Sequence, residues 1–129
     1  MMNLLTLFFL PLCAEPVQQD LIQVIDLKPS GIRVLLCPLS RHDTYALAGA
    51  YRIGNAFDGA ATSGYAHILE HHLIYRGSEF SSEDALHNKW RILGGRRNGW
   101  TYPDYTLFTV YTGEKDLYQT LEMFREMLF

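Results

Sequence analysis

The hydrophobic positions in the first half of the chain fall into short runs that predict β-strands. Residues 21–27 and 32–38 are rich in Ile, Leu and Val, and Lys-Pro-Ser-Gly occupies residues 28–31 between them. Because Pro and Gly favour a turn, we expect the two runs to pair as an antiparallel hairpin. Over residues 44–53, apolar and polar residues alternate well enough to predict a third strand. A loop rich in Gly and Ala follows over residues 54–63.

The second half alternates between helical and extended periodicity. After a capping box of Ser81 and Asp84, apolar residues recur at helical spacing until the glycine pair at 94–95, which should end that helix. Residues 97–101 and 105–112 are then expected to form two strands, joined by a turn.

The last predicted element is a helix over residues 114–129. One face of it is apolar and carries Leu117, Leu121, Phe124 and Leu128. Short turns between antiparallel neighbours, together with separate helices, predict an α+β fold in which an antiparallel sheet packs against helices.

The N-terminal residues have the layout of a secretory signal peptide. Residues 4–12 are apolar and are followed by Cys13, Ala14 and a polar change at Glu15, so we expect cleavage after Ala14 and a secreted or periplasmic location. The run is too short for a stable membrane span. Because no Lys or Arg precedes it, a buried or peripheral N-terminal segment is the alternative. Once residues 1–14 are removed, Cys37 is the sole thiol and no disulfide can form within the chain.

Residues 67–71 read His-Ile-Leu-Glu-His, which brings two imidazoles and a carboxylate into about one helical turn. His67 and His71 then share a helix face with Glu70 between them. Zinc held by two His and a third ligand keeps a place for water, lowers the pKa of that water to about 7, and needs a carboxylate to take the proton. The H-x-x-E-H order is that of the inverted zincin motif.

A helix with two surface histidines is the plainer interpretation, since this pattern arises by chance in roughly one chain in a hundred of this length. The surrounding residues favour a site. They give the helix an apolar side, which predicts that most of it is buried and that its His and Glu side chains have partners. The apolar residues are Ile68, Leu69, Leu73 and Ile74.

Two sequence blocks carry a family resemblance. Residues 64–74, with Arg-Gly-Ser at 76–78, resemble the signature of the pitrilysin/insulinase family of zinc metallopeptidases. Residues 93–108 are similar to that family's glycine pair, followed by Asn, Thr, and an acidic residue before a second Thr. Two blocks in the right order are more specific than either alone, and the similarity runs from about residue 31 to the chain end.

The resemblance implies that His67 and His71 bind Zn²⁺, that Glu70 is the general base, and that the substrate is a peptide or an unfolded polypeptide segment. It also implies that Asn98 and Gly99 lie on an edge strand that pairs with the substrate backbone. That mode supplies main-chain hydrogen bonds without reading side chains.

The chain departs from the family pattern at two positions. His72 stands where the family commonly has Met, and Gly99 replaces a usual Ala. We expect His72 to point away from the paired histidines, because adjacent helical residues do not share a face.

The third zinc ligand is missing from the pattern. In the family a glutamate several tens of residues beyond the histidines completes the site, and Glu114, Glu122 and Glu126 fall on the wrong element and too close in sequence. Two His alone make a weaker, more exposed site. We therefore expect residues 15–129 to be the N-terminal portion of a zinc metallopeptidase-like domain, an incomplete half that a homologous second domain or subunit accompanies.

The composition and charge of the chain are compatible with a metallopeptidase-like domain. The 129 residues are 48% hydrophobic, which suffices for one packed domain. The net charge of −3 argues against a nucleic-acid partner. The sequence thus predicts a zinc-dependent endopeptidase, and the alternative is a catalytically inert fragment or partner subunit that contributes structure or substrate binding.

Overall fold

The computed structural model describes residues 6–7, 22–38, 43–75 and 83–128. The predicted cleavage site after Ala14, the capping residue Ser81 and the Arg-Gly-Ser at 76–78 lie outside these residues. In chain order the elements are β1 (Thr6–Leu7), β2 (Gln23–Leu27), β3 (Ile32–Leu36), β4 (Thr44–Tyr51), η2 (Asn55–Phe57), α1 (Tyr65–Tyr75), α2 (Glu83–Leu93), β5 (Arg96–Thr101), β6 (Thr106–Gly113), η3 (Glu114–Asp116) and α3 (Leu117–Leu128).

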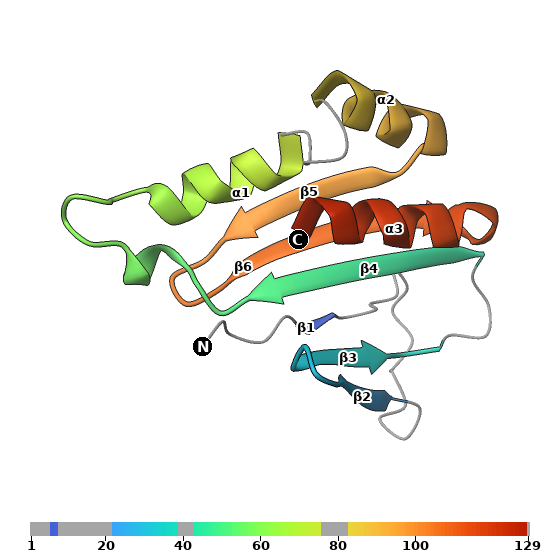
Figure 1. The fold of residues 1–129 in the computed structure, drawn as a ribbon, viewed down its shortest axis with the longest axis horizontal. Helices are drawn as coiled ribbons and strands as arrows, with labels where there is room; N and C mark the ends of the chain where they lie inside the picture. The colour runs from blue at the N-terminus through green and yellow to red at the C-terminus, as the bar shows by residue number, and fades with distance from the viewer. Residues whose placement is uncertain (1–5, 8–21, 39–42, 76–82, 129) are drawn as a thin grey trace.

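The strands form one sheet in the order β2-β3-β1-β4-β6-β5, with β5 at one edge (Figure 1). The predicted hairpin is confirmed, because β2 and β3 pair antiparallel with Leu27 opposite Ile32. Antiparallel ladders also join β4 to β6 and β6 to β5. The α+β class predicted from the sequence is therefore confirmed.

Strand β1 adds a pairing that the hydrophobic pattern did not predict. It lies between β3 and β4, parallel to β3 and antiparallel to β4. Its two residues fall inside the segment 1–14, for which a signal peptide stays a prediction. Within the described residues, no helix combines the length and apolar composition needed to cross a bilayer.

The core lies between the sheet and the helices. Alternate residues of β6 are buried, and α3 lies across β6 and β4 while α1 and α2 lie near β5 (Figure 1). The predicted apolar face of α3 is confirmed, since Phe124 and Leu128 are buried and Leu117 and Leu121 pack against the core. The buried side chains with the lowest exposure are Trp90, Phe108, Leu47, Leu86, Val110 and Thr120.

The prediction that most of helix α1 is buried is wrong. Ile68 and Leu69 are 64% and 50% exposed, whereas Ala66, Glu70 and Ile74 are buried. The three buried residues are spaced four apart and form one narrow stripe, because α1 packs along the single edge strand β5. A helix against one strand buries less than a helix against a full sheet face.

The loop that precedes α1 is anchored to the turn between β5 and β6. The amides of Asn55 and Ala56 donate to the carbonyls of Tyr102 and Pro103, at 3.0 and 2.9 Å. Gly54 makes this approach possible, because a Cβ at this residue would lie 2.0 Å from the Tyr102 carbonyl oxygen. The backbone contact ties the start of the α1 region to the end of the edge strand.

The Gly54 contact gives a test of this anchor. We expect Gly54→Ala to lower the free energy of unfolding by about 3 kcal/mol, because neither backbone can yield easily to the added methyl group. Urea unfolding followed by circular dichroism measures the change. Gly59→Ala is the matched control, since its Cβ would meet only the Thr62 hydroxyl at 3.4 Å. Equal midpoints for the two variants would contradict the anchor.

Candidate active site

Helix α1 begins at a fixed point. Gly64 has a φ of 88°, a conformation that favours glycine. The Asp58 carboxylate accepts hydrogen bonds from the amides of Gly64 and Ala66, at 2.8 and 3.2 Å. A carboxylate at a helix N-terminus satisfies amides that lack helical partners and interacts favourably with the helix dipole. The position of the next turn, which carries His67, is thereby set.

His67 and His71 face each other one turn apart on α1. Their Nε2 atoms are 3.1 Å apart, and their ring centroids are separated by 4.7 Å. Two nitrogens bound tetrahedrally to one zinc ion at about 2.0–2.1 Å would be about 3.3 Å apart. The separation of the two donor nitrogens therefore fits a shared zinc ion, and both imidazoles are exposed to receive it.

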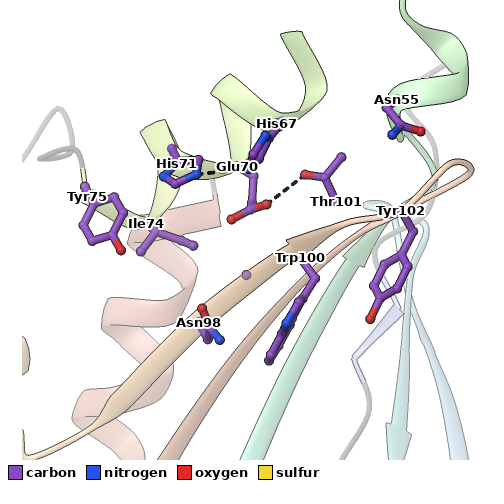
Figure 2. Close-up of a pocket in the computed structure, with 11 residues that line it drawn as sticks. Asn55, His67, Glu70, His71, Ile74, Tyr75, Asn98, Trp100, Thr101 and Tyr102 are labelled. Atoms are coloured by element: carbon purple, nitrogen blue, oxygen red, sulfur yellow. Dashed lines mark hydrogen bonds between the residues drawn. The ribbon is translucent and has the colours of Figure 1, made fainter. Parts of the chain in front are cut away.

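Glu70 lies beside the histidine pair but is buried, at 6% exposure. Its side chain points from α1 toward β5, where Thr101 Oγ1 donates to Glu70 Oε2 at 2.9 Å (Figure 2). The carboxylate thus lies between α1 and the edge strand.

Gly99 provides the space for this carboxylate. A Cβ at Gly99 would lie 2.9 Å from Glu70 Oε1 and 2.6 Å from Ile74 Cδ1. The departure from the family's usual Ala is therefore matched by a close approach of α1 to β5. An alanine there would require both side chains to move, because Glu70 Cγ would also lie 2.9 Å from the added Cβ.

Strand β5 is the outer strand of the sheet that the described residues form. The Tyr102 amide bonds the Tyr105 carbonyl at 2.9 Å, and bonded and non-bonded pairs alternate along an antiparallel ladder. With the observed register, the backbone of Asn98 pairs with β6, whereas the backbone groups of Gly99 and Thr101 face the free edge.

The side chains of β5 divide between two faces. Arg97, Gly99 and Thr101 face α1, as their contacts with Ile74 and Glu70 demonstrate. Asn98 therefore points to the opposite face, away from Glu70 (Figure 2). Of the two residues predicted to bind substrate, Gly99 offers backbone groups at the edge, whereas the Asn98 side chain lies on the face of β5 opposite Glu70.

A cavity of about 410 Å³ joins these groups. It contains His67, Glu70 and His71 together with Asn98 and Gly99, so all five predicted site residues meet at one place. The full lining is Asn55, His67, Glu70, His71, Ile74, Tyr75, Asn98, Gly99, Trp100, Thr101 and Tyr102. His72 is not part of the lining, which agrees with its expected orientation.

The other end of α1 is also held by β5. Arg97 Nε donates to the Ile74 carbonyl at 3.1 Å, and the guanidinium lies 5.5 Å from the centre of the Trp90 ring. Burial lowers the pKa of Arg97 from its usual value. His71 stacks on Tyr75 with the ring planes 26° apart. These contacts fix the helix end beyond the histidine pair.

Among the described residues, no group of three or more His, Cys, Asp or Glu side chains could hold a metal ion. The donor set is thus two imidazoles. Glu114 lies in η3, and Glu122 and Glu126 lie in α3. None of the three lines the cavity, as the sequence predicted.

Thr101 and Tyr75 belong to the site but were not predicted from the sequence. Thr101 had a usable signal, because residues two apart on a strand share a face and Thr101 follows Gly99 by two. Tyr75 follows His71 by one helical turn, which is the same kind of signal. Asn55 had no local signal, since it reaches the cavity only through the contact between its loop and the β5–β6 turn.

The sequence of this chain is similar to those of known peptidases. The sequence model of the family described as Insulinase (Peptidase family M16) matches residues 40–129. A probable mitochondrial-processing peptidase subunit beta of Arabidopsis thaliana is 26% identical over 100 residues, which cover 78% of this chain and 19% of the relative. A putative zinc protease of Caenorhabditis elegans is 28% identical over 97 residues, which cover 75% of this chain and 11% of the relative.

Solved structures share the fold. A protease from Helicobacter pylori matches with a TM-score of 0.74 and 27% identity, over 82% of this chain and 25% of that one. A peptidase M16 inactive domain from Pseudomonas fluorescens matches with a TM-score of 0.71 and 19% identity, over 82% of this chain and 26% of that one. The chain spans about a quarter or less of these proteins, and the family match covers most of its own length. This chain belongs to the insulinase family of peptidases, family M16.

Proposed function

We propose that this chain carries the zinc-binding histidines and the general base of a zinc-dependent endopeptidase that cleaves peptides or unfolded polypeptide segments. The observation that carries the proposal is the 3.1 Å separation between the Nε2 atoms of two exposed histidines, on the same stretch of helix as a buried glutamate. Membership of a peptidase family supports it. The name of the Caenorhabditis elegans relative, a putative zinc protease, supports the choice of metal.

The residues have separate roles in the proposed reaction. His67 and His71 would hold zinc through their Nε2 atoms. Bound zinc supplies a Lewis acid that polarises the scissile carbonyl and acidifies the attacking water. Glu70 takes a proton from that water and later passes it to the leaving amine. The free backbone edge of β5 at Gly99 holds the peptide in an extended conformation.

The ligand set requires a further donor. Catalytic zinc usually has three protein ligands and an open position, and the described residues offer two imidazoles. We propose that the third ligand comes from outside these residues and that a homologous second domain or subunit accompanies the chain. The Arabidopsis relative is itself named as one subunit of a processing peptidase. We also propose that residues 1–14 direct the chain to a secreted or periplasmic location.

A second candidate function is an inert member that contributes structure or substrate binding. The two-imidazole donor set favours it, because such a site binds zinc more weakly. The resemblance in fold to a domain described as inactive agrees with it. The edge strand and its cavity would then serve peptide binding alone.

A zinc-binding measurement distinguishes a metal site from two surface histidines that bind no metal. We expect His67→Ala and His71→Ala each to weaken zinc binding by more than about 10- to 100-fold. Loss of a residue that only hydrogen-bonds to a metal ligand costs about that much, and each of these substitutions removes a ligand itself. Isothermal titration calorimetry with zinc measures this. His72→Ala is the matched control and should retain wild-type affinity. Stoichiometric zinc in the variant lacking both His67 and His71 would contradict the site.

Peptide turnover separates the two candidate functions. In the presence of excess zinc we expect Glu70→Gln to reduce cleavage of an unfolded polypeptide by about 10²- to 10⁴-fold, because the amide cannot take a proton. Zinc binding and the unfolding midpoint should stay at wild-type values. Glu122→Gln on the exposed side of α3 is the control. Equal turnover in Glu70→Gln would refute the general base, and a wild-type chain that binds peptide without cleaving it would favour the inert function.

A further inference from the structure

The Glu70 carboxylate is positioned by strand β5 rather than by its own helix. Glu70 is 6% exposed, and its Oε2 accepts a hydrogen bond from the Thr101 hydroxyl at 2.9 Å. A buried carboxylate requires hydrogen-bond donors, since water is excluded from it. The Thr101 hydroxyl is such a donor, and it lies on the same face of β5 as Gly99, which has no side chain.

Gly99 limits the other side of the carboxylate. Glu70 Oε1 and Cγ lie 2.9 Å from the point where a Cβ of Gly99 would stand. The side chain therefore lies over bare backbone at Gly99 and is held by a hydroxyl at Thr101, two residues along. A glutamate has three rotatable side-chain bonds, so these two contacts decide which of several staggered arrangements it occupies.

We infer that Thr101 is a positioning residue, whose hydroxyl fixes the rotamer of Glu70 and keeps Oε1 above Gly99 at the free edge of β5. Thr101 itself does not take part in proton transfer. The inference rests on the proposed function for its catalytic consequence. Because Gly99 and Thr101 also present their backbone groups at that edge, one strand would set the position of the base and of the peptide together.

The register supplies a matched control. Thr106 lies directly opposite Thr101 on β6, is buried, and donates from its Oγ1 to the Ile53 carbonyl at 2.7 Å. It does not line the cavity. Substituting either threonine with valine removes one side-chain hydrogen bond and retains the shape. A role in stability alone would make the two valine variants behave alike.

The experiment compares Thr101→Val, Thr101→Ser and Thr106→Val in the full chain at one pH. Three-bond NMR couplings and the side-chain carbon shifts of Glu70, identified by their loss in Glu70→Gln, report its rotamer without any need for activity. We expect rotamer averaging of Glu70 in Thr101→Val, the wild-type signature in Thr101→Ser, and the wild-type signature in Thr106→Val.

Turnover with excess zinc is the second measurement. In Thr101→Val we expect kcat to fall roughly 10- to 100-fold with KM nearly unchanged, because the base is misplaced while the peptide-binding edge persists. Thr101→Ser should restore most of kcat. Zinc affinity should stay at the wild-type value in all three variants.

The outcomes are distinguishable. A single wild-type rotamer of Glu70 in Thr101→Val would overturn the inference. Rotamer averaging of Glu70 in Thr101→Ser as well as in Thr101→Val would also overturn it. An unchanged kcat in Thr101→Val, in an active protein, would overturn the catalytic consequence. If the zinc-loaded wild type cleaves no peptide, the proposed endopeptidase function fails, whereas the couplings still decide whether Thr101 positions Glu70.

Discussion

The close approach of helix α1 to the edge strand β5 is the constraint on which the site depends. The buried stripe of α1 is Ala66, Glu70 and Ile74, and it meets β5 where Gly99 has no side chain. Contacts at both ends hold this approach. Asp58 fixes the first turn of the helix, and Arg97 bonds the carbonyl of Ile74 near its last turn.

This packing gives the proposed metal ligands and the proposed general base different environments. The stripe that faces the strand buries Glu70, while His67, three residues before it, and His71, one residue after it, stay exposed. An exposed imidazole can meet an ion arriving from solvent at little desolvation cost, whereas a buried carboxylate is confined by its hydrogen-bond donor. Three residues within one turn therefore have different surroundings because only one of them faces β5.

The loop and the turn outside the site contribute through backbone contacts. Asn55 reaches the cavity because the amides of its short helix bond the turn between β5 and β6, and Gly54 permits that contact. The cavity is therefore assembled from three segments separated in sequence: the η2 loop, helix α1 and strand β5. In the proposed reaction these segments hold ion, base and peptide within one cavity.

The sequence by itself determined the local features: the β2–β3 hairpin, the strands flanking Tyr102, helix α3 and the pairing of His67 with His71. Each of these follows from periodicity, turn residues or helical spacing, which act over a few residues. The exposure of Ile68 and Leu69, the placement of Thr6–Leu7 between β3 and β4, and the bond from Thr101 to Glu70 were decided by tertiary structure. Burial depends on what packs against an element, and the two partners of the Thr101 bond lie 31 residues apart.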